Sequence, residues 1–127
     1  MTNYIRIILN NNLFIRILFI FYSVFLTFFL LKPGSENSFQ FLRAYHNTDK
    51  IAHFTFFFIL ALISFFNFSK NKIISIFLGL LFYAILTEVM QGLMNLGRSA
   101  DFFDFIADSV GIILGYFVFK YINDRFN

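Results

Sequence analysis

The chain has 127 residues, of which 59% are hydrophobic and only 13% are charged. A typical soluble domain is about 45–50% apolar with glycine included and about 25% charged, so this chain lacks the polar side chains that would cover a soluble fold. The absence of cysteine excludes disulfides and thiolate chemistry, and a net charge of +3 without a basic tract gives no sign of nucleic-acid binding. These values are typical of an all-α membrane protein whose surroundings are membrane lipid.

Four segments have the length and apolarity of transmembrane helices, which need about 20 residues. They cover residues 13–31, 51–68, 73–94 and 102–122. The first is followed by Lys32-Pro33 rather than by a small-residue cleavage site, so we expect it to be retained. The second follows Asn47 and Thr48, either of which can cap a helix, and a short polar turn at residues 70–72 separates it from the third. We expect one transmembrane domain over residues 1–127, in which the four helices form an antiparallel bundle.

The distribution of lysine and arginine predicts the orientation of this bundle. The side that holds both termini and the turn at residues 70–72 carries six of these residues, and the other side carries four. Cytoplasmic segments of membrane proteins are enriched in lysine and arginine. We therefore expect a multi-pass protein of the inner (cytoplasmic) membrane with both termini in the cytoplasm.

Polar residues gather at the opposite membrane face, where the second helix begins, the third ends and the fourth begins. Within each helix they are three, four or seven residues apart, so each helix presents one polar stripe, and the stripes can face one another. We expect these stripes to form an outward-facing pocket. Its candidate binding residues are Asp49, Lys50, His53, Glu88, Gln91, Arg98, Asp101, Asp104 and Asp108.

Glu88 is expected to be the most deeply buried acid, because it lies six residues before the end of the third apolar segment. A carboxylate at the centre of a membrane span costs roughly 2.5–3.5 kcal/mol and usually faces a partner or a water-filled cavity. The partners that the sequence offers are Arg98, Lys50 and His53. A structural ion pair with Arg98 or Lys50 is the alternative to a functional role for Glu88.

His53 and Glu88 are the candidates for catalytic acid–base groups, although no particular reaction follows from them. Together with the aspartates they could bind a hard cation such as Mg²⁺ or Ca²⁺. No metal-binding motif such as His-Glu-x-x-His is present, so we assign no metal and no cofactor. A serine nucleophile is not indicated either, because no Gly-x-Ser-x-Gly turn occurs.

Small residues mark the expected packing surface of the fourth helix. Ala107, Gly111 and Gly115 are four residues apart and so lie on one side of the helix. Lipid gives no hydrophobic drive for helix association, and small residues let two helix backbones approach closely enough to gain packing contacts. We expect this seam to be a site of close helix packing.

The polar and small residues together form a longer pattern. It reads Asp49-Lys50-x-x-His53-Phe54, Glu88-x-x-Gln91, Gly97-Arg98-x-x-Asp101-x-x-Asp104 and Asp108-x-x-Gly111-x-x-x-Gly115. This pattern, which covers about residues 49–116, resembles the VanZ-like family of small bacterial membrane proteins. The family usually carries asparagine where this chain has Asp108. The resemblance implies a multi-spanning cell-envelope protein, and the family is named for a protein linked to resistance to the glycopeptide teicoplanin.

Three functions fit these observations. The first is the binding of an envelope component, such as a cell-wall precursor, or of a glycopeptide-type antibiotic in the outward-facing pocket. The second is catalysis on a lipid-linked substrate within the membrane, with His53 and Glu88 as acid–base groups and Arg98 holding a phosphate. The third is a structural role, in which the polar cluster holds together a subunit of a larger membrane complex.

Overall fold

The computed structural model describes residues 12–32, 48–68, 70–94 and 100–126 of the chain. Its helices are α2 (Asn12–Leu31), α4 (Thr48–Asn67), the short 3-10 helix η1 (Lys70–Lys72), α5 (Ile73–Met94) and α6 (Phe102–Phe126). All four α-helices are long and apolar enough to cross a membrane, and no strand occurs among the described residues. The prediction of an all-α membrane protein with four spans is therefore confirmed.

Two helices extend beyond the apolar segments expected from the sequence. α4 begins at Thr48 rather than at residue 51, and Asp49 in its first turn lies near the positive end of the helix dipole. α6 continues to Phe126 rather than ending at residue 122, and Arg125 in its last turn lies near the negative end. Hydropathy marks only the apolar part of a helix, whereas the backbone hydrogen bonds continue into the polar residues at its ends.

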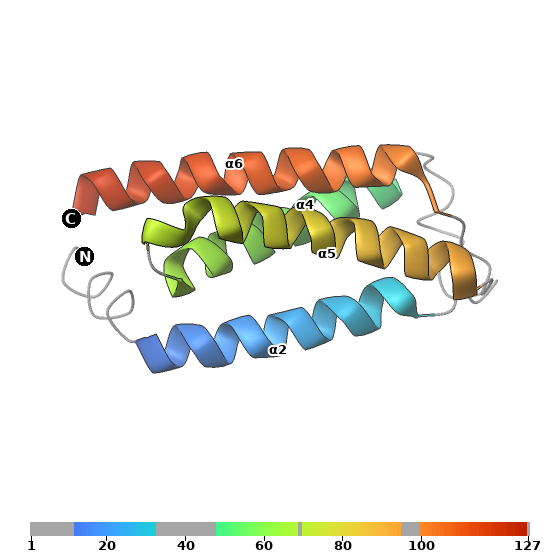
Figure 1. The fold of residues 1–127 in the computed structure, drawn as a ribbon, viewed down its shortest axis with the longest axis horizontal. Helices are drawn as coiled ribbons and strands as arrows, with labels where there is room; N and C mark the ends of the chain where they lie inside the picture. The colour runs from blue at the N-terminus through green and yellow to red at the C-terminus, as the bar shows by residue number, and fades with distance from the viewer. Residues whose placement is uncertain (1–11, 33–47, 69, 95–99, 127) are drawn as a thin grey trace.

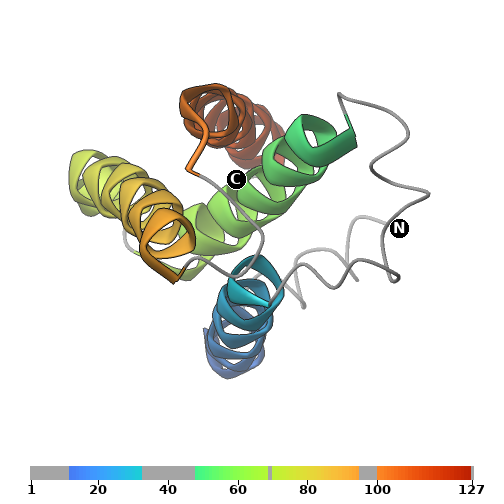
Figure 2. The same cartoon turned by 90° about the vertical axis from the view of Figure 1, so that its right-hand side faces the viewer.

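Successive helices run in opposite directions, so the bundle is antiparallel (Figure 1). Seen from its end, α4 lies between α6 and α2, with α5 to one side (Figure 2). α4 packs most extensively against α6 and also contacts α2, whereas α5 contacts both α6 and α2. This topology brings the start of α4, the end of α5 and the start of α6 to one end of the bundle, at the right of Figure 1.

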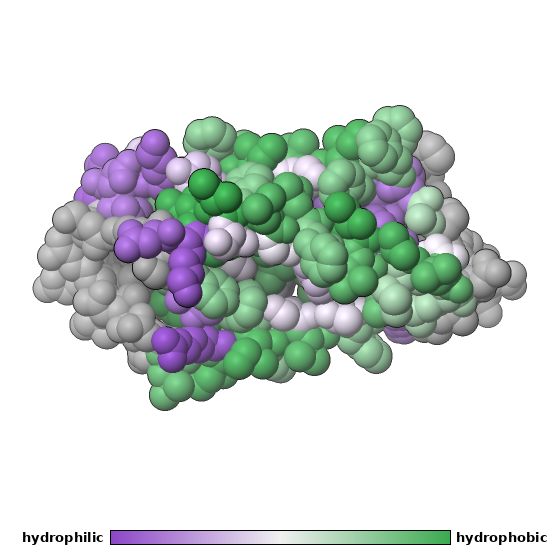
Figure 3. Space-filling model, viewed as in Figure 1, coloured by the Kyte–Doolittle hydropathy of each residue, from purple (hydrophilic) through white to green (hydrophobic). Residues whose placement is uncertain are grey.

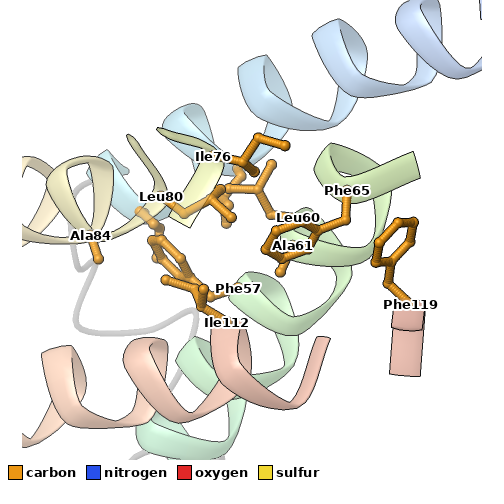
Figure 4. Packing of buried hydrophobic residues seen from close by; sticks show 11 residues of the cluster. Phe57, Leu60, Ala61, Phe65, Ile76, Leu80, Ala84, Ile112 and Phe119 are labelled. Carbon is orange, nitrogen blue, oxygen red and sulfur yellow. The ribbon is translucent and has the colours of Figure 1, made fainter. Parts of the chain in front are cut away.

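The core is formed by apolar side chains from all four helices (Figure 4). Its buried members are Leu26 and Leu30 of α2, Phe57, Leu60, Ala61 and Phe65 of α4, Ile76, Leu80 and Ala84 of α5, and Ile112 and Phe119 of α6. The ring of Phe65 lies 5.6 Å from that of Phe119 and 5.3 Å from that of Tyr116, measured between centroids. Aromatic contacts thus fill the interface between α4 and α6.

The outer surface of the bundle is largely apolar along its middle, with polar residues nearer the two ends (Figure 3). Every α-helix exposes large hydrophobic side chains, such as Phe21 on α2, Ile51 on α4, Phe82 on α5 and Phe117 on α6. Water-soluble proteins rarely expose large contiguous apolar patches, whereas lipid solvates them. This surface is therefore the face that contacts the membrane.

Two glycines of α6 lie at its closest contact with α4. A Cβ atom built on Gly111 would lie 2.5 Å from the carbonyl oxygen of Phe54 and 3.0 Å from the backbone nitrogen of Phe58. A Cβ atom built on Gly115 would lie 2.7 Å from the Cβ atom of Ala61. The two backbones thus approach within a distance that leaves no room for a side chain between them. Ala107, one turn earlier on α6, is half-buried.

Hydroxyl groups attach α2 to the rest of the bundle. The hydroxyl of Tyr22 donates to the carbonyl oxygen of Phe56 on α4 at 3.0 Å. The hydroxyls of Thr27 and Tyr83, on α2 and α5, form a hydrogen bond at 2.8 Å. In a bilayer a hydroxyl group has no water to bond, so it is satisfied by a neighbouring helix, and such bonds hold helices together.

Candidate functional site

The predicted polar residues meet at one end of the bundle, where α4 and α6 begin and α5 ends. Five of them are buried, namely His53, Glu88, Gln91, Asp104 and Asp108. Lys50 and Asp101 are half-buried, and Asp49 is exposed. Arg98 lies outside the described residues, so its place relative to the cluster stays a prediction. The cluster therefore has a reachable outer part and an enclosed inner part.

Among the acids that the structure describes, the most buried is Asp108 rather than Glu88. Asp108 is 0% exposed, whereas Glu88 is 6% exposed. The expectation that Glu88 is the most buried acid is therefore wrong. It was based only on the number of residues between Glu88 and the end of its helix. Burial also depends on which neighbour a residue faces, and Asp108 faces His53 across the close contact between α6 and α4.

The outer group consists of Asp49, Lys50, Asp101 and Asp104. The ammonium of Lys50 donates to Asp101 Oδ2 at 2.9 Å and to Asp104 Oδ1 at 3.3 Å, which joins the start of α4 to the start of α6. Asp49 precedes Lys50 in α4, and one oxygen of its carboxylate lies within 4.8 Å of a ring nitrogen of His53 and of a carboxylate oxygen of Asp104. Lys50 thus pairs with two aspartates and is not the ion-pair partner of Glu88.

The inner group consists of His53, Glu88 and Asp108. His53 Nδ1 lies 3.0 Å from Asp108 Oδ1, a hydrogen bond in which the ring nitrogen donates when the carboxylate is ionised. The same nitrogen lies 3.6 Å from Glu88 Oε1. On the other edge of the ring, Nε2 lies 4.0 Å from Asp104 Oδ2. The imidazole therefore stands between carboxylates of the inner and outer groups.

Asp101 and Glu88 have a structural role that the spacing of polar residues did not indicate. The side chain of Asp101 accepts a hydrogen bond from the backbone N–H of Phe103 at 2.8 Å, which is the geometry of a helix N-cap. The backbone N–H of Asp101 in turn donates to Glu88 Oε2 at 3.1 Å. Glu88 therefore holds the start of α6 against the end of α5, besides contacting His53.

Gln91 lies apart from the inner and outer groups. Its side-chain amide donates to the carbonyl oxygen of Leu30 at 2.8 Å. The last four carbonyls of a helix lack partners within that helix, and Leu30 is in the last turn of α2. Gln91 thus caps the end of α2 from α5, although the sequence placed it among the candidate binding residues.

Three buried polar atoms of the cluster lack a hydrogen-bond partner among the described residues. They are His53 Nε2, Glu88 Oε1 and Asp108 Oδ2. Buried polar atoms are nearly always paired, because an unpaired one loses its hydration without compensation. These three atoms therefore indicate a place where a proton, a water molecule or an ion completes the site.

A cavity of about 560 Å³ lies away from this cluster, between α2, α4 and α5. Its lining is mostly apolar and includes Lys72 and, along α5, Ser75, Gly79 and Tyr83. None of its lining residues was among the site residues predicted from the sequence. The sequence feature that could have indicated this cavity is the spacing of Ser75, Gly79 and Tyr83. These residues are four positions apart and so share one face of a helix.

Comparison with known families adds one finding. A model of the VanZ/LLP1 family matches residues 13–123, which includes all of the polar cluster and also α2. No curated protein and no solved structure matches the chain. The resemblance that the polar pattern indicated is confirmed, and it extends to the first helix, which the pattern did not cover.

Proposed function

The chain belongs to the VanZ/LLP1 family, and from this premise we propose that it is a cell-envelope protein that binds a ligand through an ammonium group of that ligand. The ligand is an envelope component or a glycopeptide-type antibiotic, and the outer group is the binding surface. Both termini lie in the cytoplasm in this proposal, so that the outer group faces the outside of the cell, where such ligands occur.

The observation that carries the proposal is the surplus of negative charge in the outer group. Among the described residues the group holds three aspartates and one lysine, and His53 lies beside Asp49 and Asp104. The side chains of Lys50 and Asp101 are 31% and 39% exposed, and Asp49 is exposed, so a ligand outside the bilayer can reach them. Lys50 already bonds Asp101 and Asp104, so a ligand's ammonium group would meet chiefly the exposed carboxylate of Asp49.

Binding of teicoplanin to the protein in lipid nanodiscs tests this proposal. Asp49→Asn removes one exposed charge without removing any described hydrogen bond. We expect it to weaken binding about fivefold, since one surface charge interaction is worth up to about 1 kcal/mol. The matched control is Asp124→Asn, which removes an exposed charge at the opposite end of α6 and is expected to leave the affinity unchanged.

Two further results bear on the same proposal. The affinity of the parent protein should fall as salt concentration rises, because exposed charges are screened. A lipid-linked cell-wall precursor carrying a free amine, tested in the same nanodiscs, distinguishes an envelope component from an antibiotic as the ligand. If neither probe binds, or if Asp49→Asn and Asp124→Asn behave alike, the outer group is not a cation-binding surface and its role is structural.

A second candidate function, catalysis on a lipid-linked substrate, is favoured by the pairing of His53 with Asp108. A histidine oriented by a carboxylate is a common general base, and Glu88 lies beside it as a second acid–base group. The test is release of phosphate from a polyprenyl diphosphate by the purified protein. Turnover that is lost in His53→Ala, with unchanged folding, would favour this function over simple binding.

A further inference from the structure

We propose that the inner group of His53, Glu88 and Asp108 binds a divalent transition-metal ion, with zinc as the best match. Each residue offers one ligand atom, and these atoms lie within 4.8 Å of one another. Ligand atoms around a tetrahedral zinc ion are about 3.3 Å apart, given metal–ligand bonds of about 2.0–2.1 Å. His53 Nδ1 lies 3.6 Å from Glu88 Oε1 and 3.0 Å from Asp108 Oδ1. Metal binding would therefore replace the hydrogen bond between His53 and Asp108 with bonds to the ion, and it would need only small shifts of these side chains.

The unpaired atoms of the inner group point to a missing ligand. Glu88 Oε1 and Asp108 Oδ2 have no partner among the described residues, and both side chains are more than nine-tenths buried. Two ionised carboxylates carry a charge of −2, which is costly in a site enclosed by apolar helices. A divalent cation bound by Glu88 Oε1 and by one oxygen of Asp108 would neutralise both carboxylates, so one ligand would account for both features.

One neighbouring contact orients a ligand of the proposed site, and a second could form when the ion binds. Metal-binding histidines usually donate their second ring N–H to a carboxylate, which fixes the tautomer. With Nδ1 on the metal, the proton would reside on Nε2. Asp104 Oδ2 lies 4.0 Å from Nε2, beyond hydrogen-bond distance, so the ring would have to shift toward Asp104 to form this bond. Glu88 Oε2 is held by the backbone N–H of Asp101 at 3.1 Å, which leaves Oε1 for the metal. Asp104 and Asp101 are thus positioning residues for this site.

A second triad, made of Asp49, His53 and Asp104, is a weaker candidate. Its ligand atoms also lie within 4.8 Å of one another. Asp104 already accepts a hydrogen bond from Lys50, and Asp49 is exposed to solvent. A metal held by this triad would compete with the Lys50 ammonium, whereas the inner group contains no competing lysine.

The donor set favours zinc over calcium or magnesium. Imidazole nitrogen and carboxylate oxygen are both zinc ligands, whereas calcium takes six to eight oxygen ligands and magnesium keeps several waters. Three protein ligands also leave a fourth position, which in zinc sites is filled by water or by a bound ligand. This inference does not rest on the function proposed above, because it concerns the inner group and is measured without an envelope ligand.

The test is metal binding by the full chain in detergent, purified without a polyhistidine tag. We expect one zinc ion per chain by elemental analysis after dialysis, and a melting temperature that rises with zinc but not with magnesium or calcium. Cobalt(II) should give visible absorption bands typical of a nitrogen and oxygen site of low coordination number. Asp108→Asn and Glu88→Gln should each abolish zinc binding, and Asp104→Asn should weaken it about 10- to 100-fold.

A control variant and folding measurements show whether a loss of zinc binding comes from the loss of a ligand or from unfolding. Asp124→Asn, at the far end of α6, should bind zinc as the parent does. Far-UV circular dichroism and melting without metal establish that each variant is folded. If either Asp108→Asn or Glu88→Gln fails to fold, the other variant still tests the site. The proposal is overturned if the parent binds no zinc at micromolar concentrations, or if Asp49→Asn rather than Asp108→Asn abolishes binding.

Discussion

The contact between α4 and α6 predicts how glycine-to-alanine substitutions change stability. In Gly111→Ala the new methyl group would lie 2.5 Å from the carbonyl oxygen of Phe54. A carbon atom and a carbonyl oxygen do not normally approach within about 3.3 Å, so the two helices must separate locally by about 0.8 Å. The atoms that obstruct the methyl group belong to the backbone of α4, which cannot rotate away as a side chain can.

The cost follows from that separation. A gap of about 0.5–1 Å forfeits a quarter to a half of the dispersion energy of the contacts it opens, and overpacking of this kind typically costs about 1–3 kcal/mol. In water, alanine would recover about 0.5–1 kcal/mol through its better helix propensity. We expect that gain to be small here, because an apolar segment in a detergent micelle, as in lipid, satisfies its backbone hydrogen bonds by staying helical. We therefore expect Gly111→Ala to lower the free energy of unfolding by about 1–3 kcal/mol.

Equilibrium unfolding in mixed micelles with increasing dodecyl sulfate, followed by near-UV circular dichroism of the tyrosines, measures this effect. Gly79→Ala is the matched control, because a Cβ atom built on Gly79 has no atom within 4 Å and should change stability by less than about 0.5 kcal/mol. Gly115→Ala should resemble Gly111→Ala. Since its methyl group meets the Cβ atom of Ala61 at 2.7 Å, adding Ala61→Gly should restore part of the loss.

Two results would refute this reasoning. The first is a similar stability for Gly111→Ala and Gly79→Ala, which would mean that α4 and α6 do not approach closely at Gly111. The second is a rescue of Gly111→Ala by Phe54→Ala, because the predicted clash is with the backbone of Phe54 and truncating its side chain cannot relieve it.

Three other predictions concern single contacts and topology. Gln91→Leu removes the hydrogen bond to the carbonyl of Leu30 and should cost about 0.5–1.5 kcal/mol in the same unfolding assay, with no loss expected if the bond is absent. Glu88→Gln keeps an acceptor for the N–H of Asp101 and should fold almost normally, whereas Glu88→Ala should lower the melting temperature; equal melting of the two would contradict the bond. Since the chain has no cysteine, a single cysteine replacing Gln40 should react with an impermeant maleimide added to intact cells, and protection would reverse the proposed orientation.

The four spans could be predicted from the sequence because the property that defines them is local. A run of about 20 apolar residues is helical and membrane-embedded whatever its neighbours are, since no other backbone arrangement satisfies its hydrogen bonds in lipid. The polar stripes were equally local, because helical periodicity alone places His53 one turn after Asp49. The antiparallel order of helices then brought the stripes to one end of the bundle.

Only the tertiary structure decided which of these residues meet. Lys50 pairs with Asp101 and Asp104 rather than with Glu88, and among the described acids Asp108 rather than Glu88 is the most enclosed. Such pairings depend on how far each helix is rotated about its axis and how closely it approaches its neighbour. At Gly111 that approach is limited by a backbone oxygen on another helix, and rotation is set by core contacts spread along the whole bundle. Neither the rotation of a helix nor its approach to a neighbour is a property of any one segment. The sequence therefore determined which segments form membrane-spanning helices, and the packing of those helices determined which atoms touch.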